Sequence, residues 1–301
     1  MPGPAGAPDG PVFERLALLG LGLIGSSAAR ACKEFGLARE VVGHARSVAT
    51  RQKAMELGFL DRVEADPAEA VRGADAVMIC TPIGAYKALA EAALPAVEPG
   101  AVVTDVGSVK ACVVRDLRPH LPAGVHLVPG HPVAGTEHSG PESGFAELFA
   151  GRFCLLTPPE DAEEAAVERV AAFWRGAGMT VHRMTPEHHD RVLAITSHLP
   201  HLIAYCIVGT ATDLEEQTRE EVIKYSAGGF RDFTRIAASD PVMWRDVFLN
   251  NQEAVLEIIQ RFTEDLTALQ RAIRWGEGDT LEEHFTRTRA VRRGVIAERQ
   301  A

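Results

Sequence analysis

The sequence feature that most constrains the fold is a glycine-rich turn, GLGLIG at residues 20–25, between an apolar run at 16–19 and a helix-like segment at 26–35. In this context Gly20 makes the tight turn, Gly22 lets a pyrophosphate approach the backbone, and Gly25 lets helix and strand pack closely. The helix N-terminus adds N–H donors and a positive dipole. A plain glycine-rich turn is the alternative. We predict a dinucleotide site formed here by Gly20, Gly22, Leu23, Ile24 and Gly25.

The second predicted strand, residues 40–43, bears on which dinucleotide is bound. The strand runs into His44-Ala45-Arg46-Ser47, where NAD enzymes place an acid on the ribose 2′-hydroxyl, and no acid is present. An arginine followed by a serine suits a 2′-phosphate, although Arg46 could also stack on the adenine or point to solvent. The sequence therefore favours NADP, with NAD possible, and Arg46 and Ser47 belong to the predicted cofactor site. Thr81 and Pro82 are predicted to belong to this site as well.

The composition indicates a globular protein of about two domains, because 46% of the 301 residues are hydrophobic. A formal net charge of −10 offers no basic surface for nucleic acid or an anionic membrane, so neither is an expected partner. The five scattered cysteines indicate a reducing compartment. Residues 1–12 are expected to be a flexible tail, and no apolar stretch is expected to reach the length of a membrane span, about 18 residues. We expect a cytoplasmic protein.

A candidate base lies in the stretch VPGHPVAGTEHSGP, residues 128–141, which follows a strand-like run at 125–128. His131 is expected on a rigid loop at a strand end, where open α/β sheets bind ligands, and histidine can move protons near neutrality. The alternative is that His131 only caps the turn. Ser108, after the strand at 101–104, lies on the same rim and could equally be a helix N-cap, while Lys110 is expected in solvent or in a structural ion pair.

The composition changes near residue 185. Thr185-Pro186-Glu187 is typical of a helix start, so the adjacent His188 and His189 are interpreted as structural, and no metal site is predicted. No strand is expected beyond this point. We predict a dinucleotide-binding domain at 13–185 and an all-helical substrate and dimerisation domain at 186–301.

Two clusters in the second half could bind substrate. Within a helix at 192–210 that is apolar nearly all round and therefore expected to be buried, Pro200 should cause a kink, and His198 and His201 share a face. Two core histidines satisfied by the backbone are the alternative. Further along, GGFRDFTR at 228–235 places Arg235 beside an apolar stretch, which predicts an anion anchor there, with Arg231 as a surface charge.

A helix of about 33 residues is predicted from Pro241 to the stop at Gly276, because apolar residues recur there at spacings of three and four. Such a helix would be about 50 Å long, more than one small domain covers. We therefore expect a homodimer with this helix in the interface.

Five motifs, in this order between residues 20 and 244, resemble the prephenate/arogenate (cyclohexadienyl) dehydrogenases of tyrosine biosynthesis: GLGLIGSS, TDVGSVK, GHPVAGTEHSGP, SHLPH and GGFRDFTRIAASDPVMW. The resemblance implies an α/β Rossmann-like dinucleotide-binding domain followed by an all-α dimerisation domain. It also implies an oxidative decarboxylation, in which hydride leaves the ring carbon that carries the hydroxyl, carbon dioxide leaves the opposite carbon, and the ring aromatises.

The resemblance also implies residue roles. His131 matches the catalytic histidine that bonds the ring hydroxyl, Ser108 the serine that orients it, and Arg235 the arginine on the ring carboxylate. His201, Thr136 and Glu137 match residues that shape the substrate pocket and its gate. His201 slightly favours prephenate over arogenate, and a protein that accepts both is compatible with the motifs.

Two other functions remain open at this point. One is a β-hydroxyacid-type two-domain dehydrogenase, which would need a lysine acid/base in the helical half, where only Lys224 is a candidate. The other is a catalytically silent NADP-binding sensor, because fold and fingerprint do not imply turnover.

Overall fold

The structure is a computed structural model that describes residues 10–136, 138–213, 221, 224–225 and 228–297. The chain divides into two compact units, residues 1–252 and residues 253–301. The predicted tail at 1–12 lies mostly outside the described residues. Its last residue is ordered by a hydrogen bond from Val12 N–H to the Leu37 carbonyl at 2.9 Å.

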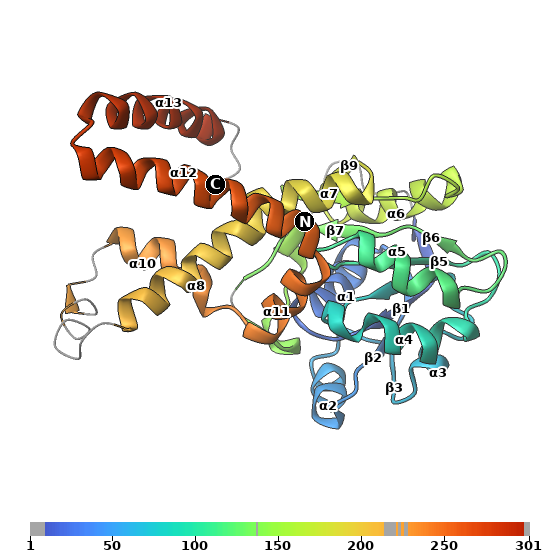
Figure 1. The fold of residues 1–301 in the computed structure, drawn as a ribbon. Coiled ribbons are helices and arrows are strands. Elements are labelled where there is room, and N and C mark those ends of the chain that lie inside the picture. The colour runs from blue at the N-terminus through green and yellow to red at the C-terminus, as the bar shows by residue number, and fades with distance from the viewer. Residues whose placement is uncertain (1–9, 137, 214–220, 222–223, 226–227, 298–301) are drawn as a thin grey trace. The chain divides into compact units, whose positions relative to one another are not determined.

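The first unit is built on a parallel six-stranded sheet in the order β3-β2-β1-β4-β5-β6 (Figure 1). Its strands are β1 (Phe13–Leu19), β2 (Ala38–His44), β3 (Arg62–Glu64), β4 (Ala76–Ile79), β5 (Val102–Asp105) and β6 (His126–Leu127). Strand order reverses at β1 and β4, the place where ligands bind in open α/β sheets. The glycine turn lies at that reversal, directly after β1.

Both faces of this sheet are buried, which explains the nearly continuous apolar runs of its central strands. Leu16 and Leu18 of β1 join a core with α1 (Leu23–Phe35) and α6 (Glu164–Gly176), whereas Ala17 and Leu19 join a second core on the other face. Three helices cover that second face: α3 (Pro67–Val71), α4 (Tyr86–Ala93) and α5 (Ala111–Leu117). The helix α2 (Val48–Glu56) follows β2.

A second sheet has the order β7-β8-β9, with strands β7 (Gly130–Pro132), β8 (Phe153–Leu156) and β9 (Thr180–Arg183). β8 and β9 therefore do not extend the six-stranded sheet. The prediction of a loop at His131 is wrong, because this residue pairs with Leu155 in the antiparallel β7–β8 ladder. Pro129 has no N–H to continue a ladder, and the chain turns there from one sheet to the other.

The helical part of the first unit begins at Thr185, where the sequence predicts a helix start. Thr185 accepts a hydrogen bond from His188 N–H and caps α7 (Pro186–Leu193), which confirms the predicted helix start. A π-helical turn (Ala194–His198) leads into α8 (Leu199–Thr212), so the helix is irregular just before Pro200, and the kink expected at this proline stays a prediction. Beyond Arg183, the described residues contain no strand. They continue with α10 (Gly228–Thr234), a 3-10 turn (Arg235–Ala238) and α11 (Pro241–Asn250).

Short 3-10 turns connect several of these elements. They are Ile83–Ala85, Leu94–Ala96, Arg118–His120, Pro141–Ser143 and Ala146–Phe149. The cysteines are free: Cys32, Cys112 and Cys154 are buried, Cys80 is partly buried, and Cys206 is exposed.

The prediction of one long helix from Pro241 is wrong, because the helix breaks at Asn251. The backbone of Asn251 leaves the helical region, and its side chain donates to the Asp190 carbonyl at 2.9 Å. Tertiary hydrogen bonds thus replace helical ones at this residue, which periodicity alone does not reveal.

The second unit is a pair of helices, α12 (Gln252–Trp275) and α13 (Gly278–Ala297), joined at Gly276 in the left-handed conformation (Figure 1). Large apolar side chains remain exposed on both helices, among them Leu256, Leu266, Ile273 and Phe285.

The apolar helix at 192–210 is less buried than predicted. In α8 only Ala204 is fully buried. The helical stretch Pro186–Thr212 spans 27 residues and contains an 18-residue window with a mean hydropathy of 1.6, so one helical segment is long and apolar enough to cross a bilayer by length and composition. The expectation that no stretch reaches this length is wrong. The same stretch carries the buried polar residues His189, Asp190 and His198, which belong to the candidate active site.

Candidate active site

The glycine turn has the shape that a dinucleotide requires. Gly20 adopts φ +115°, and a Cβ there would lie 2.6 Å from the Cys80 carbonyl carbon, while a Cβ on Gly25 would overlap the Gly20 carbonyl oxygen. At Gly22, by contrast, no described atom beyond the adjoining residues lies within 4 Å of a Cβ position. No described side chain caps the N-terminus of α1, and its first turn holds no acid. Open space and uncapped N–H groups at a helix start fit a pyrophosphate.

The other predicted cofactor residues lie around this turn. The Thr81 hydroxyl is buried without a hydrogen-bond partner among the described residues, and Pro82 follows it. Arg46 is exposed directly after β2, and Ser47 caps α2 by accepting from Thr50 N–H at 3.4 Å. Arg51 donates to the Ala45 and Arg46 carbonyls at 2.6 and 3.0 Å and so holds this turn. These residues fit a nicotinamide dinucleotide.

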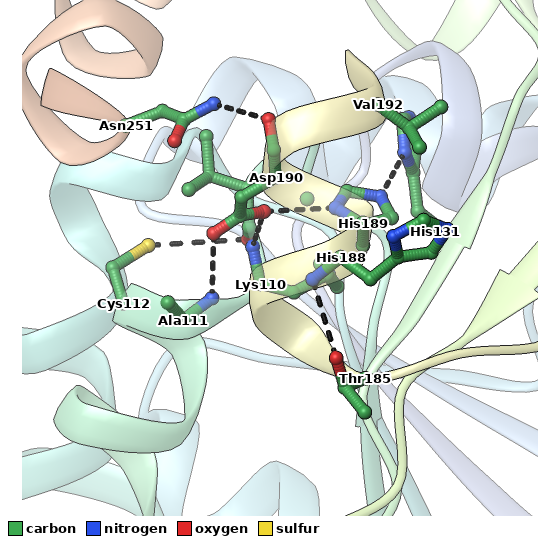
Figure 2. A network of polar contacts seen from close by, with 12 residues as sticks. Lys110, Ala111, Cys112, His131, Thr185, His188, His189, Asp190, Val192 and Asn251 are labelled. Carbon is green, nitrogen blue, oxygen red and sulfur yellow. Dashed lines mark hydrogen bonds and ion pairs between the residues drawn. The ribbon is translucent and has the colours of Figure 1, made fainter. Parts of the chain in front are cut away.

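His131 lies at the start of a hydrogen-bonded series of side chains (Figure 2). The residue is 7% exposed, and its Nδ1 lies 2.9 Å from Nε2 of His189 on α7. His189 Nδ1 in turn lies 2.8 Å from Asp190 Oδ1. The Asp190 carboxylate also accepts from the backbone N–H groups of Lys110 and Ala111, at 2.8 and 2.9 Å. A side chain of α7 therefore caps α5.

A buried ion pair holds the strand that carries His131. Lys110 Nζ lies 2.5 Å from Asp105 Oδ2 and 2.6 Å from the Gly130 carbonyl, and both charged side chains are fully buried. Asp105 also accepts from Gly130 N–H at 3.2 Å and from the Tyr86 hydroxyl at 3.1 Å. The predicted structural ion pair of Lys110 is confirmed. Because Gly130 precedes His131, this pair positions the histidine backbone.

Ser108 is half-buried in the turn between β5 and α5, and the alternative that it caps this helix is wrong. The helix begins at Ala111, three residues further on, with Asp190 supplying the cap. The Ser108 backbone lies close to His198, whose Nδ1 is 3.1 Å from Asn251 Nδ2. Ser108 is thus linked to the His131 network through His198 and Asn251.

The second predicted cluster lies next to this network. The His198 ring is 6.0 Å from Trp244, and Trp244 stacks on His201 at a centroid distance of 3.7 Å. His201 Nδ1 is 2.8 Å from the Ser197 carbonyl, which leaves Nε2 as the acceptor of a neutral ring. Arg235 is exposed at the start of its 3-10 turn, and its charge lies near enough to lower the pKa of His201 after the larger effect of burial.

The structure describes one of the two predicted gate residues. Thr136 is exposed, and its hydroxyl accepts from His138 N–H at 3.3 Å. Glu137 lies outside the described residues, so its predicted role stays a prediction.

Burial keeps the histidines of the network neutral. Burial first, and then the charges of His189, Lys110 and His198, lower the pKa of His131 well below 6.5. Burial likewise lowers the pKa of His189 to about 2. Burial also lowers the pKa of His198 to about 4, although the Asp190 charge and a backbone hydrogen bond with Ser108 act to raise it. An imidazole that is uncharged near neutrality can accept a proton or a hydrogen bond.

Sequence reasoning missed His189, Asp190 and Asn251 as parts of the site. The sequence interpreted His189 as part of an ordinary helix start, because the burial of His189 and Asp190 becomes visible only in the packed structure. In the described part of the chain, no group of three His, Cys, Asp or Glu residues is placed to hold a metal ion.

A parallel sheet with an open glycine turn at its reversal, in a protein that also holds a buried neutral histidine, is typical of a dinucleotide-dependent oxidoreductase. Two family models match the chain: "Prephenate dehydrogenase, nucleotide-binding domain" over residues 28–183 and "Prephenate dehydrogenase, dimerization domain" over residues 185–287. The chain belongs to the prephenate dehydrogenase family.

Individual relatives agree with this assignment. A cyclohexadienyl dehydrogenase of Zymomonas mobilis is 43% identical over 93% of this chain and 96% of its own length. The crystal structure of prephenate dehydrogenase from Aquifex aeolicus, in complex with hydroxyphenyl propionate and NAD+, has a TM-score of 0.88 at 33% identity and covers 94% of this chain and 98% of its own. Synechocystis arogenate dehydrogenase has a TM-score of 0.79 at 26% identity over 93% and 99%.

These matches decide between the functions left open by the sequence. The protein is an NAD(P)-dependent dehydrogenase of the prephenate/arogenate type, rather than a β-hydroxyacid-type dehydrogenase or a silent sensor. The predicted fold class, a Rossmann-like domain followed by a helical dimerisation domain, is confirmed.

Proposed function

We propose that His131 is the base with which this dehydrogenase oxidatively decarboxylates prephenate, arogenate or both. The observation that carries this assignment is the buried, uncharged ring of His131, held from two sides beside the cofactor-binding sheet. The relatives named cyclohexadienyl, prephenate and arogenate dehydrogenase support this substrate class.

The reaction requires mainly that the protein orient the reacting groups. The ring hydroxyl donates a hydrogen bond to His131, which takes up the charge that develops on oxygen as the hydride leaves its carbon. Cleavage of the bond to the opposite carboxylate supplies the electron pair that completes the aromatic ring, and the proton that His131 shares during hydride transfer ends on the phenol oxygen of the product. Aromatisation drives the reaction, so the residues act mainly by positioning.

The bound dinucleotide supplies the hydride acceptor, and we assign its pyrophosphate to the turn at Gly20, Gly22 and Gly25, with Leu23 and Ile24 beside it. Thr81 and Pro82 would face it from the end of β4. We further propose NADP as the preferred form, because Arg46 and the hydroxyl of Ser47 stand where an acid would select NAD. The Aquifex aeolicus neighbour is described with NAD+, so cofactor choice has to be measured on this protein.

The remaining predicted site residues are assigned to substrate binding. Arg235 anchors the ring carboxylate, since its charge lies near His201, the residue that stacks on Trp244. Ser108 orients the hydroxyl from the rim next to His198, and His201 presents Nε2 to the substrate. Thr136 and Glu137 are assigned to the gate.

We also propose a homodimer, because exposed apolar side chains remain on α12 and α13 within a region matched by a dimerisation model. A cytoplasmic location and a functional boundary at residues 185/186 belong to the same proposal.

The test is an assay of the purified protein with prephenate and with arogenate, each with NADP and with NAD. Reduced cofactor should form together with 4-hydroxyphenylpyruvate or tyrosine and one equivalent of carbon dioxide. Formation of reduced cofactor without loss of carbon dioxide, or no turnover of either substrate, would contradict the proposed function.

A further inference from the structure

The hydrogen bonds behind His131 determine which of its two nitrogens carries the proton. Asp190 receives three donors: two backbone N–H groups at the start of α5 and the ring of His189 (Figure 2). Burial raises the pKa of Asp190, and the backbone N–H groups of Ala111 and Lys110, together with the Lys110 charge, oppose this effect and favour the ionised form. An ionised carboxylate only accepts hydrogen bonds, so His189 donates to it from Nδ1. Asp190, which caps α5, thus determines that the proton of His189 is on Nδ1.

His189 transmits this orientation to the next ring. It is fully buried, and burial lowers its pKa to about 2, so the ring is neutral and holds a single proton. With that proton on Nδ1, Nε2 of His189 can only accept. Its partner at 2.9 Å, His131 Nδ1, must therefore be the donor. A neutral His131 protonated on Nδ1 has an unprotonated Nε2.

We propose that His189 and Asp190 are positioning residues that hold His131 in the tautomer protonated on Nδ1, which leaves Nε2 free to accept the hydrogen bond of the substrate hydroxyl. This inference rests on the proposed role of His131. In the opposite tautomer Nε2 would carry a proton and could not accept, so the wrong tautomer would be inactive even with every ring in place.

The charged and titratable neighbours of His131 within the described residues are engaged elsewhere. From the turn before α5, the Lys110 ammonium donates to Asp105 and to the Gly130 carbonyl. From the π-helical turn, His198 faces Asn251. His189 on α7 is the side chain that bonds the His131 ring, so it sets the tautomer.

The direct test is a two-bond ¹H–¹⁵N correlation spectrum of the full-length protein labelled with ¹⁵N-histidine, in which the two neutral tautomers have distinct nitrogen shifts. We expect His131 and His189 both to be protonated on Nδ1 at neutral pH. A wild-type His131 protonated on Nε2 overturns the proposal, whatever the variants show.

Variants separate tautomer control from packing. Asp190→Asn keeps an oxygen to cap α5 but can donate from its amide to His189, which should reverse both rings. We expect kcat to fall by about 10² to 10⁴, the range in which a general base contributes, with KM changed less than about threefold. His189→Phe removes the acceptor altogether and should lower kcat similarly, whereas His189→Gln, whose amide oxygen can accept from His131, should recover at least about tenfold.

The matched control is His188→Phe, at the exposed neighbouring position of the same helix, which should leave kcat and the His131 spectrum unchanged. Equal activity of His189→Phe and the wild type, or a failure of Asp190→Asn to change the His131 tautomer, would overturn the proposal. Absence of activity with both substrates would instead contradict the proposed function, because the spectrum of the wild type does not depend on turnover.

Discussion

His131 and Arg235, the proposed base and the proposed carboxylate anchor, lie in very different surroundings. The His131 ring is buried and hydrogen-bonded to α7, and the residue before it is held by a buried ion pair from β5 and the turn before α5. Arg235 is exposed at the first residue of a 3-10 turn. The comparison indicates that the protein fixes the atom that takes part in chemistry and leaves the binding group near solvent, where the substrate can reach it.

The largest expected effect is at the buried end. His131→Asn should lower kcat by about 10² to 10⁴, because a general base contributes that much, while the dissociation constant of the cofactor changes little. Steady-state kinetics and a cofactor titration measure the two quantities. A loss below tenfold in kcat would show that His131 is not the base, and the contrast between His131 and Arg235 would no longer hold.

At the exposed end the effect should fall on binding. Arg235→Gln should raise KM by about 10- to 100-fold, since a charge-assisted hydrogen bond is worth about 1.5–3 kcal/mol, with kcat changed less than about threefold. Arg231→Gln, an exposed arginine one turn earlier, is the control and should leave KM unchanged. An unaltered KM for Arg235→Gln would end its assignment as the anchor.

The buried end should also make stability depend on pH. In the folded protein burial lowers the pKa of His131, His189 and His198, whereas all three titrate near 6.5 when unfolded. Below pH 6.5 the unfolded chain therefore binds more protons, so stability is full above this pH and falls as the pH decreases toward the folded-state values. Each histidine should contribute a loss of about 1.4 kcal/mol per pH unit.

Urea unfolding at pH 6.0, 5.5 and 5.0 measures this slope. In His131→Asn the slope should be shallower by about one proton, because one buried imidazole has been removed. Identical slopes for the variant and the wild type would show that His131 is not held neutral by the fold.

The smallest expected effect concerns Arg46, which is exposed like Arg235 but near the cofactor. Arg46→Ser should shift the ratio of kcat/KM for NADP over NAD by about fivefold toward NAD, since an exposed ionic contact contributes up to about 1 kcal/mol. The exposed Arg39→Ser, on the far end of β2, is the control. A wild-type preference for NAD would contradict the interpretation of this turn.

Local patterns predicted much of the fold. The glycine turn lies between strand and helix as expected, and α7 starts at Thr185, because these features depend on neighbours a few residues away. Patterns that depend on distant partners were wrong: periodicity gave no warning of the break at Asn251, and the strand that carries His131 was expected as a loop.

The sequence by itself determined the dinucleotide-binding turn and the residue types at the two ends of the proposed site. Only the tertiary structure decided how the base is held. Lys110 and Asp190, 80 positions apart, meet in one hydrogen bond, and Asn251 joins them from 61 positions beyond Asp190. No local rule relates residues at such separations, because their hydrogen bonds form only after the sheets and helices have packed. The sequence identified His131 as a candidate base, whereas only the folded structure shows that His189 and Asp190 hold it.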